Sequence, residues 1–172
     1  AGPSLCEPLR FPRTGLTSRN RTVLAAMTNR QSHADGTLSE EEIHFLLMRA
    51  AGGFGIITTA CAHVSADGQG FPGELGVFAD RHVPQLKRLA DGLRERGALS
   101  LVQIFHAGLR APESLTGAQP LAPSAQATDA ARCGTAREMM PADIQRIVDD
   151  HAHAARRIAA AGFDGIELHG AH

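Results

Sequence analysis

Two histidines, His169 and His172, stand three residues apart directly after the last apolar run of the sequence, "FDGIEL". Imidazole rings at close spacing can bind a metal ion, and His106 is a third candidate ligand. The His-x-x-His pattern alone is weak support for zinc, however, and no carboxylate motif accompanies it. We therefore predict no metal site, and the paired imidazoles require another explanation.

Further candidate residues stand where earlier apolar runs end. Met27 and Thr28 close "TVLAAMT", Ala60 closes "FGIITTA", and Gln103 to His106 close a third run. If these runs are parallel strands of a barrel, their carboxyl ends meet on one face, where barrel active sites form. The sequence therefore predicts one site built from the ends of several strands.

The elements that position these residues alternate in type. Short, continuous apolar runs are typical of strands buried on both faces of a parallel sheet. Such runs span residues 22–28, 54–60, 98–105 and 163–168. Helical patterns separate them, so the predicted order is strand, helix, strand, helix, strand, helix, strand, which indicates a parallel α/β fold.

Three helices are predicted from apolar spacing and from capping residues. The first begins at a capping box in which the Ser39 side chain accepts from the first turn and Glu42 reaches back. The second has Asp80 as its cap and Gly97 as its stop, and the third begins at Pro141. Their predicted buried stripes are Ile43, Leu46, Leu47 and Ala50; Val83, Leu86, Leu89, Ala90 and Leu93; and Ile144, Ile147, Val148, Ala155 and Ile158.

Residues 107–140 form a long segment rich in Pro, Gly, Ala, Ser and Thr, without clear periodicity. A loop of this length in a compact domain is usually a functional lid or a disordered segment. We predict that it covers part of the active-site mouth.

Two α/β architectures compete for this pattern. An open doubly wound sheet would usually carry a Gly-x-Gly-x-x-Gly turn after a strand, and the sequence has none. A (β/α)₈ barrel requires about 250 residues. We therefore predict that residues 1–172 are the first half of a TIM barrel, with about four parallel strands, and form part of a single domain without an internal boundary.

Composition excludes several classes of function. The 17 Lys and Arg and 18 Asp and Glu residues are scattered, which argues against nucleic acid and anionic membranes as partners. No apolar stretch approaches the length of a membrane span, and the first residues lack a signal-peptide pattern, so we expect a cytoplasmic protein. Cys6, Cys61 and Cys133 show no paired spacing and are expected to be reduced.

Three motifs carry a resemblance to a known family. "RNRTVLAAMTNR" resembles the first-strand motif of the Old Yellow Enzyme family, "LVQIFHAGLR" is similar to its third-strand motif, and "AGFDGIELHGAH" resembles its fourth-strand signature. The resemblance covers nearly the whole chain. It implies a (β/α)₈ barrel that binds FMN at the C-terminal mouth and reduces activated carbon–carbon double bonds with NADH or NADPH.

The resemblance implies a cofactor role for six residues, one of which is His169. Ala26, Met27 and Thr28 would run along the isoalloxazine ring, with the Thr28 hydroxyl tuning the redox potential. Ala60 would lie under the flavin. Gln103 would pair with the pyrimidine edge, because an amide offers both a donor and an acceptor. Without the motif, Gln103 would be interpreted as a satisfied polar residue in a barrel layer.

The resemblance also explains the paired histidines. His169 and His172 would donate hydrogen bonds to the carbonyl oxygen of an enone or enal, which is oxyanion-type stabilisation. Arg30 would line the substrate mouth. Glu167, on the same side of its strand as His169, would either orient an imidazole or be neutralised by a basic residue from another strand. His106 is predicted to be a packing and hydrogen-bonding residue.

Several parts of the implied enzyme are missing from this sequence. The phosphate-binding amides, the basic residue at flavin N1 and the proton-donating Tyr would follow His172, and the chain has no Tyr. A half barrel also exposes sheet edges and an apolar face. We therefore expect a homo-oligomer or a complementing C-terminal half-barrel, and the alternative function is a non-catalytic assembly module.

Overall fold

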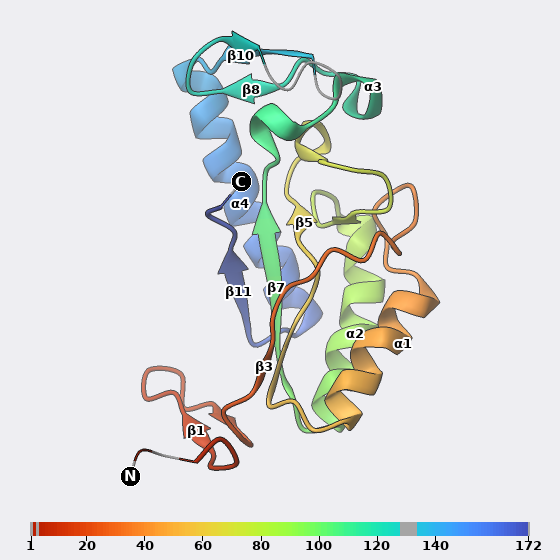
Figure 1. Cartoon of the computed structure of the whole chain (residues 1–172), viewed down its shortest axis with the longest axis vertical. Coiled ribbons are helices and arrows are strands. Elements are labelled where there is room, and N and C mark those ends of the chain that lie inside the picture. The colour runs from red at the N-terminus through yellow and green to blue at the C-terminus, as the bar shows by residue number, and fades with distance from the viewer. Residues whose placement is uncertain (1, 3, 128–133, 172) are drawn as a thin grey trace.

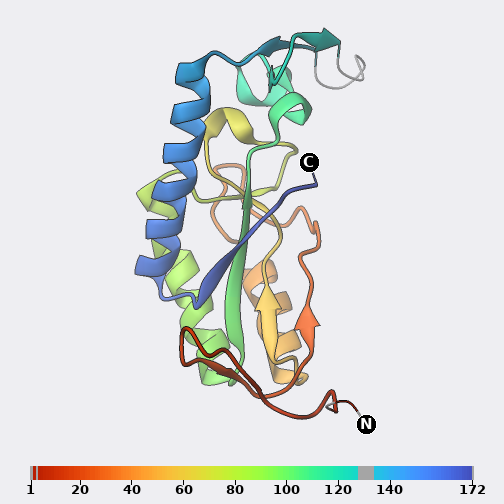
Figure 2. The ribbon, with the colours of Figure 1, turned by 90° about the vertical axis from the view of Figure 1, so that its left-hand side faces the viewer.

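The computed structural model describes residues 2, 4–127 and 134–171. Four parallel strands form its centre, and they lie side by side in the order in which they occur in the sequence (Figures 1 and 2). They are β3 (Val23–Leu24), β4 (Ile56–Thr58), β7 (Leu99–Phe105) and β11 (Gly165–Leu168). Doubly wound sheets reverse strand order at a switch point, whereas barrels do not. The predicted half barrel is therefore confirmed.

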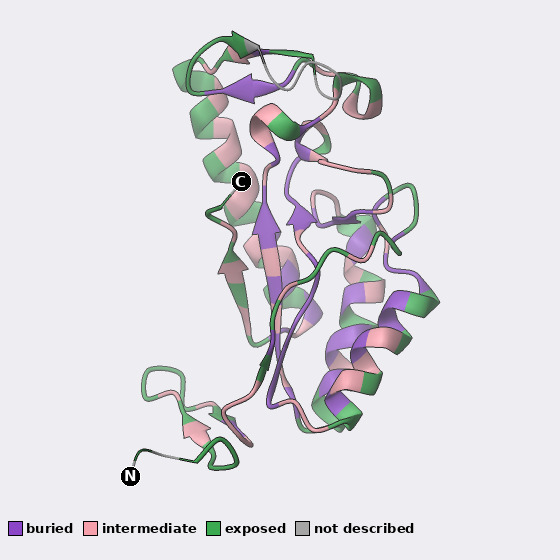
Figure 3. Cartoon of the chain, viewed as in Figure 1, coloured by how far each residue is buried: buried purple, intermediate pink, exposed green. Residues whose placement is uncertain are grey.

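Three long helices pack against these strands. They are α1 (Glu40–Ala51), α2 (Val83–Glu95) and α4 (Pro141–Ala161). One hydrophobic core joins them to the sheet, with Ile43 and Leu46 from α1, Leu89 from α2, Ile158 from α4 and Val102 from β7 all buried. Figure 3 shows buried residues on β7 and on parts of α1 and α2, whereas β11 has none.

Smaller elements cluster around the two ends of the strands. At the carboxyl end lie β5 (Ala62–His63), β6 (Leu75–Gly76), the 3₁₀ turns η1 (Ala66–Gly68) and η3 (Gly108–Arg110), and the helix α3 (Glu113–Thr116). A further 3₁₀ turn, η2 (Asp80–His82), leads into α2. None of the described helices is long and apolar enough to cross a membrane.

An antiparallel hairpin of β1 (Leu9–Arg10) and β2 (Thr17–Ser18) lies near the amino ends of the central strands (Figure 1). The sequence did not predict it, because strands of two residues leave no periodic pattern. Arg19 attaches it to the barrel: its guanidinium donates to the carbonyl oxygens of Ala50 at 2.5 Å, Phe54 at 2.7 Å and Arg96 at 2.8 Å.

The segment 107–140 is not the structureless loop that its composition predicts. It contains η3, α3 and a small sheet of β8 (Leu121–Ala122), β10 (Thr135–Glu138) and β9 (Gln126–Ala127), in that order. Arg137 stabilises the end of this sheet through two hydrogen bonds to Asp143 on α4, at 2.7 and 2.8 Å. Residues 128–133, including Cys133, lie outside the described residues.

The first predicted strand is shorter and more exposed than expected. Only Val23 and Leu24 form β3, and Val23 and Met27 are 49% and 50% exposed. Among the described strands, β3 pairs with β4 alone. One edge and one face of this segment are therefore open, so an apolar run at this position does not imply burial on both faces.

Two predicted helix starts were also partly wrong. The Ser39 hydroxyl accepts from the Glu42 N–H at 3.1 Å, as expected, but the Glu42 carboxylate accepts from Asn29 and Ser32 instead of reaching back. The Asp80 carboxylate does not cap α2, because it accepts from Arg157 Nε at 2.7 Å. Each carboxylate bonds to a side chain distant in sequence, which local spacing cannot reveal.

The predicted stripe of α4 is buried only toward its C-terminal end. Ile158 is buried, whereas Ile144 and Val148 are 50% and 57% exposed. The described sheet ends at β11, so the first turns of α4 extend past the strands that could cover them (Figure 1).

Candidate active site

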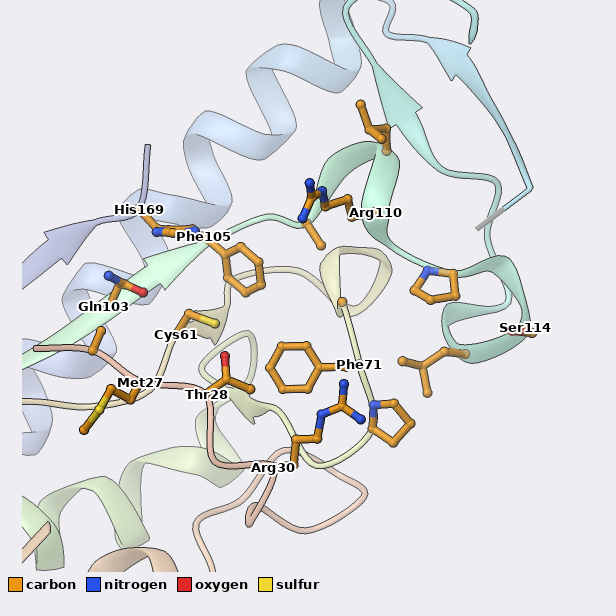
Figure 4. A pocket seen from close by; sticks show the side chains of 17 residues that line it. Met27, Thr28, Arg30, Cys61, Phe71, Gln103, Phe105, Arg110, Ser114 and His169 are labelled. Carbon is orange, nitrogen blue, oxygen red and sulfur yellow. The ribbon is translucent and has the colours of Figure 1, made fainter. Parts of the chain in front are cut away.

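A cavity of about 1080 Å³ lies at the carboxyl ends of the central strands (Figure 4). Its wall combines the segment after β3, the residue Cys61 after β4, the end of β7, and His169 after β11. The remaining wall comes from the loop Gly70–Pro72, from η3 and from α3. Its lining residues are Ala26, Met27, Thr28, Arg30, Cys61, Gly70, Phe71, Pro72, Gln103, Phe105, Ala107, Leu109, Arg110, Pro112, Ser114, Leu115 and His169.

The segment after β3 contributes Ala26, Met27 and Thr28 to one wall of this cavity. Thr28 is exposed, and its hydroxyl makes no hydrogen bond to any other residue that the structure describes. Figure 4 shows this hydroxyl pointing into the cavity. It is therefore available to a ligand, as the sequence predicts.

Gln103 projects from β7 and is held by a residue on the next strand. Its Nε2 donates to Glu167 Oε1 at 2.5 Å, and the two residues are register partners across β7 and β11. An ionised carboxylate only accepts hydrogen bonds, so the amide nitrogen must face Glu167. The amide oxygen and the second N–H of Gln103 then remain for a ligand. Glu167 therefore orients an amide, a role that neither sequence interpretation included.

His169 lines the cavity just beyond the end of β11. Its backbone N–H donates to the Ile104 carbonyl oxygen at 3.0 Å, which continues the pairing with β7 by one residue. Its imidazole meets the Phe105 ring edge-on, with centroids 5.7 Å apart and planes at 74°. This contact packs one side of the imidazole against the cavity wall. The second predicted imidazole, that of His172, lies outside the described residues.

Ala60 does not line the cavity. It is buried, with 4% exposure, and its carbonyl oxygen accepts from the Thr59 hydroxyl at 2.8 Å. The next residue, Cys61, reaches the cavity instead. The structure therefore brings six of the eight predicted residues together, namely Ala26, Met27, Thr28, Arg30, Gln103 and His169.

Cys61 was not predicted as a site residue, because no motif distinguishes it. Its Sγ lies 3.8 Å from Oε1 of the buried Glu74, toward which it donates. Burial, and after it the neighbouring Glu74 carboxylate, raise the pKa of the Cys61 thiol to about 12. The thiol in the cavity wall is therefore neutral over the physiological range.

Arg30 enters the cavity from the loop after β3, with its guanidinium 5.4 Å from the centre of the Phe71 ring. Two further lining residues, Phe105 and Arg110, belong to the third-strand motif "LVQIFHAGLR". That motif was the signal that could have identified them. Phe71 lies in a loop without such a signal.

His106 lies outside the cavity, in the packing role that the sequence predicts. Its Nδ1 accepts from the Gly108 N–H at 3.0 Å, and its Nε2 lies 3.5 Å from Asp67 Oδ1. Asp67 also accepts from both terminal nitrogens of Arg146, at 3.1 and 2.6 Å. The neighbouring His106 imidazole and the hydrogen bonds from Arg146 hold the pKa of Asp67 well below its usual range. These contacts join η1, β7 and α4 behind the site.

The described residues contain no group of three or more His, Cys, Asp or Glu side chains that could hold a metal ion. Cys6 and Cys61 are free thiols. The polar side chains that line the cavity are one amide, two hydroxyls, one thiol, one imidazole and two guanidinium groups, from Gln103, Thr28, Ser114, Cys61, His169, Arg30 and Arg110.

Known proteins share this sequence and fold. The chain is 38% identical over 168 residues to the probable NADH-dependent flavin oxidoreductase YqiG of Bacillus subtilis, covering 98% of this chain and 44% of that protein. It is 36% identical over 160 residues to the NADH:acrylate oxidoreductase of Vibrio harveyi, covering 92% and 16%. The chain thus spans less than half the length of these relatives.

A solved structure agrees with both the fold and the resemblance. The old yellow enzyme homologue from Zymomonas mobilis superposes with a TM-score of 0.88 at 29% identity, over 97% of this chain and 48% of that chain. Residues 4–172 match the family described as "NADH:flavin oxidoreductase / NADH oxidase family". The resemblance to Old Yellow Enzymes is therefore confirmed, and the chain belongs to the NADH:flavin oxidoreductase / NADH oxidase family.

Proposed function

We propose that the protein carrying this chain is an FMN-dependent oxidoreductase that reduces the activated C=C bond of α,β-unsaturated carbonyl compounds with NADH or NADPH. One observation carries the proposal: six residues from three separate motifs line a single cavity at the strand ends. The names of the two relatives support NADH as a hydride donor, and acrylate is an alkene conjugated to a carboxyl group.

The residues of the cavity fit a flavin. Its volume of about 1080 Å³ is slightly above the roughly 300–1,000 Å³ that is usual for small-molecule sites. Gln103 retains one N–H and one carbonyl oxygen, which is the donor and acceptor pair that a pyrimidine edge requires. Ala26 and Met27 offer an apolar surface for an aromatic ring, and Thr28 offers a hydroxyl at its edge. When bound, FMN would supply hydride transfer between the nicotinamide and the alkene.

His169 would polarise the substrate. An imidazole N–H directed at the carbonyl oxygen stabilises negative charge that develops there as the β-carbon accepts hydride. The edge-on contact with Phe105 limits the reorganisation that this donor needs. His172 would supply a second donor. The chain contains no Tyr, so the phenol that the resemblance implies as proton donor is not among these residues.

Glu167 would act as a positioning residue through Gln103. Its carboxylate fixes which way the amide faces, because only the amide N–H can meet it. Without that constraint, the amide could present a donor where the pyrimidine edge also has a donor. The pairing of the two residues in adjacent strands keeps this orientation independent of the loops.

The test is anaerobic spectroscopy of the protein that carries this chain. After incubation with FMN, we expect bound flavin whose visible absorbance is bleached by NADH or NADPH and restored by cyclohexenone. Cyclohexanone, which lacks the double bond, is the matched control and should restore nothing. A colourless protein would favour the alternative of a non-catalytic half-barrel module, and bleached flavin that cyclohexenone does not reoxidise would contradict ene reduction.

A further inference from the structure

The charged groups that line the cavity are of one sign. They are the guanidinium groups of Arg30 and Arg110, and no Asp or Glu is among the described lining residues. Two acids lie behind the wall, Glu74 and Glu167, and both already accept hydrogen bonds from neighbouring groups. No acid in the described lining of the cavity therefore offsets the positive charge of Arg30.

Arg30 has an unusual backbone conformation. Its φ is 55°, the only positive φ at a described non-glycine residue. Residues other than Gly adopt this left-handed region at a cost, and such residues occur disproportionately at active sites and ligand clamps. The strain suggests that the position of this side chain matters for a ligand.

The neighbouring loop holds Arg30 in this conformation. A Cβ at Gly73 would lie 2.5 Å from the Arg30 carbonyl oxygen, so only glycine allows this approach of the two backbones. The Ser32 N–H donates to the Gly73 carbonyl oxygen at 3.1 Å, which connects the two segments. Glu74 in turn accepts from the Gly70 N–H at 2.9 Å and fixes the start of the loop.

The Arg30 side chain is oriented but not neutralised. Its guanidinium packs over Phe71 at 5.4 Å from the ring centre, and Figure 4 shows both groups facing the cavity. In the described part of the chain, no carboxylate lies within ion-pair distance of it. A guanidinium that is held in place, exposed to a cavity and unpaired with any acid is suited to bind a carboxylate or phosphate by two parallel hydrogen bonds.

We propose that Arg30 forms an anion subsite at the mouth of the cavity and selects ligands that carry a carboxylate or a phosphate. This inference rests on the proposed function, because the anion belongs to one of the two reactants. It is either a carboxylate on the alkene or a phosphate of the nicotinamide donor. Both sources share the chemistry that Arg30 recognises, and the experiment separates them.

The test compares wild type with Arg30→Gln, which removes the charge, and Arg30→Lys, which keeps the charge but loses the planar fork. Arg156→Gln, at an exposed position on α4 outside the cavity, is the matched control. Crotonate and its neutral analogue crotonamide probe the alkene in calorimetric binding without a hydride donor. NADH and 1-benzyl-1,4-dihydronicotinamide, which has no phosphate, probe the donor in flavin reduction.

A hydrogen-bonded charge contributes roughly tenfold to a hundredfold in affinity. If the alkene carries the anion, Arg30→Gln lowers the preference for crotonate over crotonamide by about that factor. If the donor carries it, the preference for NADH over the benzyl analogue falls instead. For the preference that Arg30→Gln lowers, Arg30→Lys should give a value between those of Arg30→Gln and wild type.

The inference is overturned if Arg30→Gln changes neither the preference for crotonate over crotonamide nor the preference for NADH over the benzyl analogue. It is also overturned if the variant retains less FMN while both preferences stay as in wild type. Failure of the proposed function would look different, because wild-type flavin would then not be bleached by NADH. Crotonate binding needs no hydride transfer and would still report whether Arg30 binds an anion.

Discussion

At the scale of single residues, the site depends on side chains that are oriented before a ligand arrives. Glu167 sets the direction of the Gln103 amide, and the Phe105 ring packs edge-on against the imidazole of His169. Such preorganisation strengthens transition-state stabilisation because the donors need not reorganise during the reaction. The predictions at this scale concern His169 and Cys61.

Replacing His169 with Ala should slow alkene reduction by about 100-fold, the usual effect of removing one oxyanion donor. Flavin reduction by NADH should change far less, because it develops no charge on the substrate carbonyl. Stopped-flow measurement of the two half-reactions separates these effects. His153→Ala, at an exposed position on α4, is the control. An equal loss in both half-reactions would indicate damage to the flavin site instead of a lost donor.

Cys61 should resist alkylation because its thiol stays protonated. Its pKa is raised from 9.0 to about 12 by burial and by Glu74. The folded state therefore holds this proton more tightly than the unfolded state, and the free energy of unfolding should fall as the pH rises from about 9 toward 12.

Iodoacetamide labelling followed by mass spectrometry should modify the exposed Cys6 much faster than Cys61 at about pH 8 to 10. Equal rates would contradict the account, and Glu74→Gln should accelerate labelling of Cys61.

The sequence predicted most of this site but not its supporting contacts. Ala26, Met27, Thr28, Arg30, Gln103 and His169 share one cavity because they follow the ends of parallel strands, which apolar patterning reveals. Cys61 was missed because no motif distinguishes it, and Phe71 and Glu74 were missed because they lie in a loop that folds back on the cavity wall. Local spacing carries no information about such contacts.

At the scale of elements, the network of His106, Asp67 and Arg146 joins three elements behind the cavity. Asp67 belongs to η1, His106 follows β7, and Arg146 lies on α4. The Asp67 and Arg146 side chains are 25% and 40% exposed, so solvent weakens the pair. The contact nevertheless fixes where the loop after β5 meets the third-strand motif.

Asp67→Asn should lower the free energy of unfolding at neutral pH by about 1–2 kcal/mol, because charge-assisted hydrogen bonds are lost. The folded-state pKa of Asp67 is depressed, so its stabilisation exists above the ordinary value of 3.8 and disappears as the pH falls further. The difference between wild type and variant should therefore shrink below about pH 4. Urea denaturation followed by circular dichroism measures it, with Glu41→Gln, an exposed acid on α1, as control. A difference that is constant with pH would contradict a role for the charge.

Long strands that are buried by their neighbours could be predicted from the sequence, whereas short strands that depend on distant partners could not. Runs such as 98–105 were recognised because a seven-residue strand, β7, is buried by its neighbours. The hairpin of β1 and β2 and the small sheet of β8, β10 and β9 were missed because strands of two to four residues depend on partners distant in sequence. The edge position of β3 likewise exposes residues that look apolar enough for a core.

At the scale of the whole molecule, the structure is a curved set of parallel strands covered by helices on one side (Figure 2). Its apolar surface is concentrated near the last strand and the last helix. Ile166 and Leu168 on β11 are 39% and 68% exposed, and Ile144 and Val148 on α4 are half exposed. Surfaces of this kind usually contact another chain or segment.

We predict that residues 1–172 expressed alone self-associate through this surface. Sedimentation velocity should give a mass above the 18.2 kDa of the monomer that rises with concentration. Val148→Lys should shift the distribution toward monomer, because a charge on an apolar interface costs binding energy. Ala152→Lys, at another exposed position of α4, is the comparison. A monomer at every concentration would contradict the prediction.

The proposed function requires that the cavity at the strand ends holds a flavin ring. A crystal structure of the FMN-loaded protein would show where the ring binds. We predict the isoalloxazine ring along Ala26 to Thr28, with its pyrimidine edge hydrogen-bonded to the Gln103 amide and Gln103 still bonded to Glu167. FMN bound elsewhere, or a ring whose pyrimidine edge lies away from Gln103, would contradict the account.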